Sequence, residues 1–211
     1  LLDCLGRLFA VLPRLLAYAF CCGVGDLIYF GLKKKRRALL SNLHHAFPDK
    51  PRAWHLKTAR MSCRRTVELG LFALVSPAFS QKRLRRHFTL GDNLKKELKH
   101  ALETKESGVI LVPHFSLMEA LTTLPAHFDE PIMPVGVLYR PLKQAALDRY
   151  VKRTRERFGL KLVSRRDGFD APMQMLREGG LVAVLFDQNA GTSGVLTTFF
   201  GRVASTTDLP G

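Results

Sequence analysis

Two titratable residues that follow a short apolar run, His114 and Glu119, are the clearest candidates for chemistry in this sequence. A separation of five positions would place them about 140° apart on a regular helix, so they could not share a helical face. They can meet if His114 lies in the turn after a strand and a helix begins at Ser116, which makes Glu119 its third residue. An imidazole beside a carboxylate at the carboxyl end of a buried strand suits general base catalysis.

A structural interpretation accounts for the same residues. Ser116-x-x-Glu119 also matches a capping box, in which the glutamate bonds the backbone at the start of a helix, and His114 is then an ordinary turn residue. Spacing alone favours this second interpretation. A zinc site is not expected, because one histidine and one carboxylate are too few ligands. The sequence contains no Gly-x-Ser-x-Gly elbow, so a covalent serine intermediate has no support.

The elements that must position these residues alternate between short apolar runs and amphipathic segments from residue 107 onward. The apolar runs predict strands at residues 109–112, 132–138, 160–163 and 181–186. The segments between them predict helices at residues 117–128, 142–158 and 171–177. Strands joined by crossover helices predict an α/β fold with a mostly parallel sheet covered by helices.

The N-terminal part of the chain has a different character. Residues 15–32 are apolar or small except for Asp26, and a basic cluster follows at residues 33–37. Eighteen residues are at the lower limit for crossing a bilayer, so both a spanning and an interfacial segment are open. Charges placed after the apolar run keep the body of the protein on the cytoplasmic side. We therefore expect a membrane anchor at 1–37, a helical region at 38–104 and an α/β core at 105–211.

The overall charge restricts the kinds of partner. Lys and Arg number 33 against 18 Asp and Glu, a formal net charge of +15, which favours anionic partners. Nucleic acid is disfavoured, because the basic residues are spread along the chain without a recognised binding motif. None of the four cysteines forms a C-x-x-C pair, and this is typical of buried thiols in a reducing compartment.

Arg155 differs from the other basic residues of its predicted helix. It follows Val151 by four residues and precedes Phe158 by three, so it shares a face with two candidate core residues. A guanidinium on that face needs a partner. Either it forms a structural ion pair with Asp148 or Asp187, or it contacts a substrate phosphate or a developing oxyanion.

Several stretches of the sequence, taken together, resemble one family. His114-x4-Glu119 after an apolar strand, in a basic protein with an N-terminal membrane segment, is similar to the bacterial lipid A biosynthesis acyltransferases, the lauroyl and myristoyl transferases of the lysophospholipid acyltransferase superfamily. Further matching segments occur in order along nearly the whole chain. They are residues 37–43 with 46–48, residues 139–141 with 147–148 and 155–159, and residues 186–191 with 199–201 and 204–206.

The resemblance implies transfer of a fatty acyl chain from acyl carrier protein to a hydroxyl of an anionic lipid A precursor, at the cytoplasmic face of the bacterial inner membrane. It implies that His114 is the general base, that Glu119 orients its imidazole, and that no cofactor is needed. It makes Arg140, Arg155 and Asp187 substrate-binding candidates. Asp187 should lie at the same sheet edge as His114, or it caps the following loop, and Arg140 is a phosphate contact or a loop charge. Family members continue well past residue 211, so a fragment or truncated member is expected.

Three other functions remain as alternatives. A glycerophospholipid acyltransferase would use the same histidine–acid pair, although those relatives usually carry Asp as the acid. A basic membrane-surface protein or an inactive fragment would keep the fold without the activity. Nucleic-acid binding is the weakest of the three.

Overall fold

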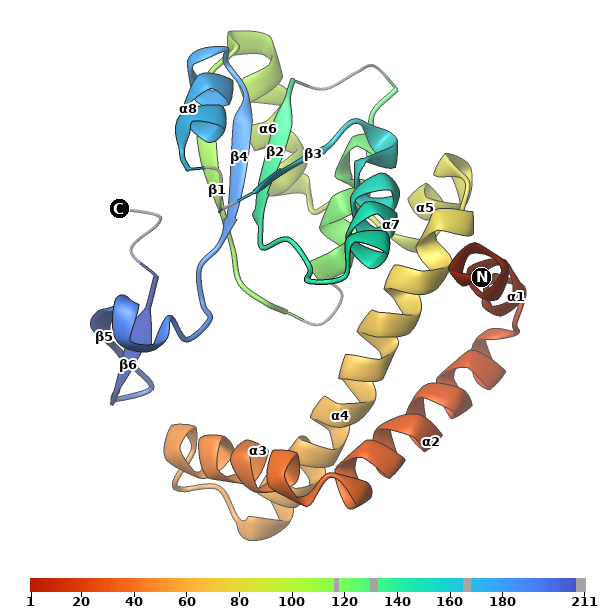
Figure 1. The fold of residues 1–211 in the computed structure, drawn as a ribbon, viewed down its shortest axis with the longest axis vertical. Helices are drawn as coiled ribbons and strands as arrows, with labels where there is room; N and C mark the ends of the chain where they lie inside the picture. The colour runs from red at the N-terminus through yellow and green to blue at the C-terminus, as the bar shows by residue number, and fades with distance from the viewer. Residues whose placement is uncertain (116–117, 130–132, 165–167, 208–211) are drawn as a thin grey trace. The chain divides into compact units, whose positions relative to one another are not determined.

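The computed structural model describes residues 1–115, 118–129, 133–164 and 168–207, and the chain divides into two compact units (Figure 1). The first unit contains Leu1–Ala78 and residues 189–206, together with Phe115. The second contains residues 79–114 and the described residues from Met118 to Gln188. Each unit has its own architecture.

A parallel sheet of four strands is the centre of the second unit, with strand order β1-β4-β2-β3 (Figure 1). The strands are β1 (Gly108–Val112), β2 (Val135–Tyr139), β3 (Lys161–Ser164) and β4 (Leu181–Leu185). The apolar runs in the sequence therefore form the predicted parallel strands, each within a few residues of its expected position. Ile132, the expected start of the second strand, lies outside the described residues.

Helical segments cover both faces of this sheet, as predicted. On one face Leu181 and Val135 pack with Leu98 and Leu124. On the other face Val182 and its neighbours pack with Met175. The helical segments of the second unit are α5 (Gln81–His87), α6 (Asp92–Thr104), η2 (Met118–His127), α7 (Ala145–Arg155), η3 (Glu156–Phe158) and α8 (Asp170–Arg177). Neighbouring residues of β4 point to opposite faces, which is why its run is apolar throughout.

The helix predicted after His114 is present and has a 3₁₀ form. Residues Met118–His127 form a 3₁₀-helix with Pro125 inside it. Proline has no backbone N–H to donate, so a regular α-helix cannot continue through this position. The hydroxyls of Thr122 and Thr123 donate to the carbonyls of Glu119 and Ala120 at 2.7 and 2.6 Å, three residues back. These bonds support the tighter turn.

The first unit is built from helices and one hairpin. Its helices are α1 (Leu2–Ala10), α2 (Arg14–Gly31), α3 (Lys33–Ala46), α4 (Arg52–Val75), η1 (Ser76–Ala78) and η4 (Gly191–Ser193). Helices α2 and α4 pack so closely that a Cβ on Gly25 would lie 2.5 Å from the Arg64 Cα. Tyr29, Ala59 and Cys63 are buried in this contact. Among the described residues, α2 is the one helix whose length and mean hydropathy of 1.2 would allow it to cross a membrane.

An antiparallel hairpin, which the sequence did not predict, completes the first unit. Strands β5 (Val195–Phe199) and β6 (Arg202–Thr206) pair through a turn at Phe200 and Gly201, whose φ angles are +50° and +67°. Positive φ at both central residues is the geometry of a tight two-residue hairpin turn. The Phe200 ring lies 5.0 Å from that of Phe47, so residues 46–48 and 199–201 of the matching segments meet in space.

Candidate active site

The register of the parallel sheet brings His114 and Asp187 together. Val112 at the end of β1 pairs with Leu185 at the end of β4. His114 and Asp187 each follow these paired residues by two positions, so both leave neighbouring strands at the same level. The carboxyl edge of a parallel sheet is where α/β proteins place their sites. The sequence expectation that Asp187 shares the sheet edge of His114 agrees with this geometry.

Asp187 binds His114 in two ways. One carboxylate oxygen lies 2.5 Å from the imidazole Nδ1, and the other accepts a hydrogen bond from the His114 backbone N–H at 2.8 Å. Both side chains are about one quarter exposed, 24% for His114 and 28% for Asp187. The aspartate therefore fixes both the ring and the turn that carries it.

The protonation of this pair follows from the environment of Asp187. Partial burial opposes ionisation of the carboxyl group, but the ring and backbone hydrogen bonds of His114 outweigh it and lower the pKa of Asp187. An ionised carboxylate can only accept hydrogen bonds, so Nδ1 of His114 carries a proton. In the neutral imidazole the unprotonated nitrogen is then Nε2, whose lone pair can accept a proton.

Glu119 has a different partner from the one expected. Its two carboxylate oxygens accept hydrogen bonds from Nε and Nη2 of Arg155, both at 2.7 Å, in a bidentate ion pair. The Glu119 side chain is 9% exposed and that of Arg155 is 28% exposed. In the structure Asp187, and not Glu119, is the hydrogen-bonded partner of the His114 ring, and the catalytic role expected for Glu119 stays a prediction. The capping alternative concerned Ser116, which lies outside the described residues.

Arg155 occupies the position that its helical spacing predicted. It is partly buried at the end of α7, whereas Arg149 and Lys152 on the same helix are exposed. The ion-pair partner is Glu119 rather than Asp148 or Asp187. Sequence alone could not identify it, because the partners come from segments 36 positions apart.

Arg140 lies directly after β2, at the same carboxyl edge of the sheet, and is exposed. Its loop is held by Asp148, whose carboxylate accepts a hydrogen bond from the Leu142 backbone N–H at 2.8 Å. The Tyr139 hydroxyl lies 3.5 Å from the same carboxylate. Asp148, which the sequence offered only as an ion-pair partner of Arg155, thus anchors the loop that carries Arg140.

A histidine with a carboxylate on Nδ1, at the carboxyl edge of an α/β sheet, is an arrangement that general acid–base chemistry can use. Residues 2–211 match the family described as bacterial lipid A biosynthesis acyltransferase, so the chain belongs to that family. No curated protein sequence matches the chain. Within the described residues, no group of three or more His, Cys, Asp or Glu side chains is placed to hold a metal ion.

Proposed function

We propose that this acyltransferase moves a fatty acyl chain from acyl carrier protein to a hydroxyl of a lipid A precursor, with His114 as the general base. Membership of the family supports the reaction and the class of acceptor. The observation that carries the assignment of His114 is the hydrogen bond from its Nδ1 to Asp187, which leaves Nε2 as the basic nitrogen.

The reaction is a direct transfer. Nε2 of His114 removes the proton of the acceptor hydroxyl as its oxygen attacks the thioester carbonyl carbon. A carbon–oxygen bond forms, the carbon–sulfur bond breaks, and the imidazolium returns the proton to the departing thiolate. General base catalysis of this kind contributes about 10²–10⁴-fold to the rate.

Asp187 is the residue that orients His114 in this mechanism. An ionised carboxylate on Nδ1 fixes the tautomer and stabilises the imidazolium that forms when Nε2 takes the proton. Its second hydrogen bond, to the His114 backbone, holds the turn after β1 in place. Glu119 does not act on His114 in this mechanism. Its role is to position the guanidinium of Arg155.

Arg155 and Arg140 are the proposed contacts for the anionic parts of the substrates. Glu119 engages two N–H groups of Arg155, on Nε and Nη2, and the guanidinium carries further donors that can reach a phosphate or the developing oxyanion. Arg140 is exposed at the same sheet edge as His114. The net charge of +15 favours an anionic acceptor, and the basic cluster at residues 33–37 after the apolar run favours the cytoplasmic face of the inner membrane.

The test is acyl transfer from acyl carrier protein to a lipid A precursor by the His114→Ala variant. We expect turnover to fall by about 10²–10⁴-fold while the chain stays folded. His100→Ala is the matched control, because His100 is an exposed histidine of α6. Full activity in His114→Ala would refute the mechanism. A folded chain that transfers no acyl group at all would favour the alternative of an inactive membrane-surface protein.

A further inference from the structure

Helix α2 turns its apolar side outward. Large exposed residues recur three, four or seven positions apart, so they lie along one face of the helix. They are Leu16, Phe20, Leu27 and Phe30, with exposures of 57%, 42%, 73% and 56%. The opposite side of the helix, at Cys21, Gly25 and Tyr29, is buried against the rest of the first unit. An apolar face of this kind needs an apolar environment.

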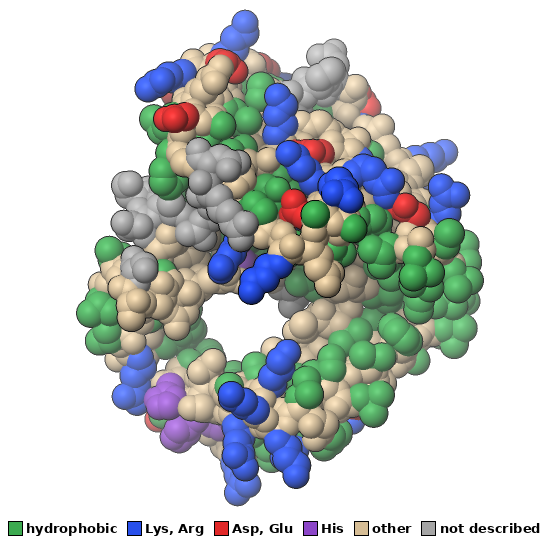
Figure 2. Space-filling view, viewed as in Figure 1, with side chains coloured by type: hydrophobic (Ala, Val, Ile, Leu, Met, Phe, Trp, Pro, Cys, Tyr) green, Lys and Arg blue, Asp and Glu red, His purple; other side chains and the backbone are tan. Residues whose placement is uncertain are grey.

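Helix α1 extends this apolar surface. Its exposed hydrophobic residues include Leu5 and Leu8, at 36% and 62%. The ring of Phe9 lies 5.2 Å from that of Phe20, which joins the two helices. Figure 2 shows hydrophobic side chains along α1 and α2 and lysine and arginine side chains over α3. We refer to the exposed apolar side chains of α1 and α2 as the outer apolar face, which includes Leu5, Leu8, Leu16, Phe20, Leu27 and Phe30.

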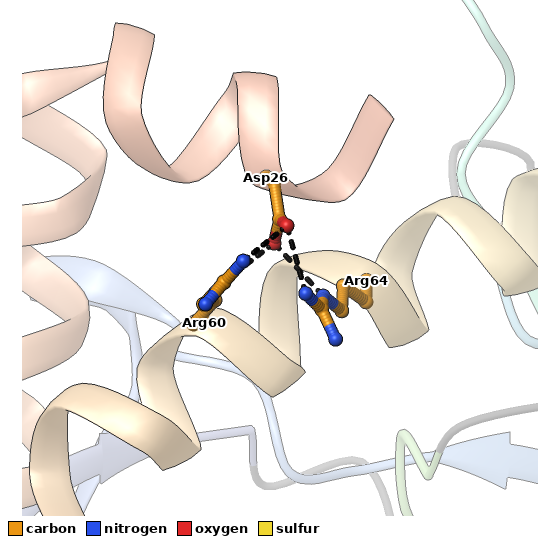
Figure 3. Close-up of polar contacts among 3 residues, drawn as sticks. All are labelled: Asp26, Arg60 and Arg64. Carbon is orange, nitrogen blue, oxygen red and sulfur yellow. Dashed lines mark hydrogen bonds and ion pairs between the residues drawn. The ribbon is translucent and has the colours of Figure 1, made fainter. Parts of the chain in front are cut away.

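Charged residues of α4 lie beside the C-terminal half of α2. Asp26 of α2 accepts two hydrogen bonds from Arg60 and two from Arg64, at 2.5–2.8 Å (Figure 3). Close packing at Gly25 places the Arg64 backbone against α2 itself. The Arg60 side chain remains 44% exposed. Ion pairs with charged residues of α4 thus hold α2 on α4 at the position of Asp26.

This packing disfavours an α2 that crosses a bilayer. The two helices run antiparallel, since Asp26 meets Arg60 and Arg64 while Gly6, before α2, meets the Leu74 carbonyl near the end of α4. A transmembrane α2 would therefore draw Arg60 and Arg64 to the depth of Asp26, within the hydrocarbon. Charged side chains at that depth are costly. Separating the helices would instead leave the Asp26 carboxylate unpaired in the apolar phase.

We propose that α1 and α2 lie within one leaflet of an anionic phospholipid bilayer, parallel to its surface, with the outer apolar face in the acyl-chain boundary. The charged side of α4 then stays at the headgroups and water. Lys33, Lys34 and Lys35 at the start of α3 follow α2 directly, and they meet the negative surface of the same leaflet. This inference rests on membrane association and not on the acyl transfer proposed above.

Tryptophan depth measurements on the whole chain separate the two orientations. Trp54 is the only tryptophan, so Trp54→Phe provides a silent background. Phe20→Trp and Phe30→Trp are then introduced separately into this background. Each variant is bound to phosphatidylethanolamine–phosphatidylglycerol vesicles that carry bromine at different acyl-chain positions. The two sites are about 15 Å apart along the helix axis. For a helix parallel to the surface, both tryptophans should be quenched most by bromine at the same shallow position.

A spanning helix would give a different result, with Phe20→Trp quenched most by bromine near the bilayer centre and Phe30→Trp near the headgroups. That outcome overturns the proposal, and so does the absence of quenching at both sites. Asn42→Trp is the control, because Asn42 is an exposed polar residue of α3 and should remain unquenched. The readout needs no substrate, so it stands whether or not the acyl transfer assay succeeds.

The ion pair provides an independent measurement. If Asp26 holds α2 on α4, Asp26→Ala should lower the thermal unfolding temperature of the chain and broaden the depth profile of Phe20→Trp. Asp49→Ala is the matched control, because Asp49 is an exposed aspartate of the same unit. An unchanged unfolding temperature and depth profile in Asp26→Ala would show that the ion pair does not fix the orientation and would contradict this part of the proposal.

Discussion

Asp187 holds His114 by its ring and by its backbone, at 2.5 Å to Nδ1 and 2.8 Å to the amide nitrogen. A single side chain thus sets both the tautomer of the imidazole and the path of the turn after β1. We propose that Asp187, and not Glu119, is the acid on which a proton-transfer mechanism at His114 depends. This relationship also separates the site into two pairs, His114 with Asp187 and Arg155 with Glu119.

Asp187→Asn should therefore lower acyl transfer by about 10²–10⁴-fold, because the amide preserves size but loses the charge that stabilises the imidazolium. Steady-state kinetics with acyl carrier protein as donor measure the effect, which should appear in kcat more than in KM. Asp170→Asn is a suitable control, since Asp170 is exposed in the first turn of α8. Equal activities in the two variants would remove Asp187 from the mechanism.

The lowered pKa of Asp187 has a consequence for stability against pH. A carboxyl whose pKa is lower in the folded state contributes stability above its unfolded pKa of about 3.9, and this contribution is lost as pH falls through the folded pKa. We expect the wild type to unfold at higher denaturant concentration than Asp187→Asn at neutral pH. The difference should narrow below about pH 4. If the difference in stability between the wild type and Asp187→Asn grew as the pH fell, the pKa of Asp187 would not be lowered in the folded state.

Strand positions could be predicted from the sequence because buried parallel strands are short apolar runs. The runs at 109–112 and 181–186 correspond to β1 and β4, and His114 and Asp187 follow them. What the sequence could not supply is the strand order. Asp187 meets His114 because β4 lies next to β1 in the sheet, with β2 on the other side of β4. The order of the strands along the chain does not determine which strands are neighbours in the sheet.

The contact of Glu119 and the hairpin could not be predicted from the sequence, each for its own reason. The partner of Glu119 depends on where α7 ends in space, so spacing within residues 114–119 could not reveal Arg155. A departure from a regular α-helix within residues Met118–His127 could have been inferred from Pro125, which a purely periodic analysis overlooks. The hairpin at 195–206 has no strongly buried strand, since the residues of β5 are all exposed.

Arg155 should respond to substitution differently from its neighbours on α7. Arg155→Ala leaves the buried Glu119 carboxylate without its partner and should cost about 3 kcal/mol of unfolding free energy. Arg149→Ala and Lys152→Ala remove exposed charges, so their effect should be within about 0.5 kcal/mol. Denaturant unfolding of the three variants provides the comparison. Similar losses in all three would refute a special role for the pair.

Arg155→Lys distinguishes a structural from a substrate role. Lysine keeps the charge but loses the fork that binds both oxygens of Glu119. If Arg155 also contacts an anionic substrate, turnover should fall at least tenfold more than the loss of folded protein explains. A stability loss with normal turnover per folded molecule would assign the pair to structure alone.

Two glycines of α2 offer a test of the helix packing on which the interfacial orientation depends. A Cβ at Gly25 would lie 2.5 Å from the Cα and 2.8 Å from the backbone nitrogen of Arg64, whereas one at Gly23 would meet nothing within 4 Å. Alanine is favoured over glycine in a helix by about 1 kcal/mol, so Gly23→Ala should be neutral or stabilising. Gly25→Ala must push α2 away from α4 and should destabilise the chain by about 1–3 kcal/mol.

Denaturant unfolding of both variants in detergent micelles measures this difference, since each substitution adds the same methyl group to the same helix. The displacement in Gly25→Ala also moves Asp26 away from its two arginines, so the loss should exceed the steric cost when salt is low and shrink as salt screens the ion pair. Equal stabilities for Gly23→Ala and Gly25→Ala would mean that α2 is not packed on α4. In that case α2 would be free to cross the bilayer alone, and the orientation inferred for α1 and α2 would lose its structural basis.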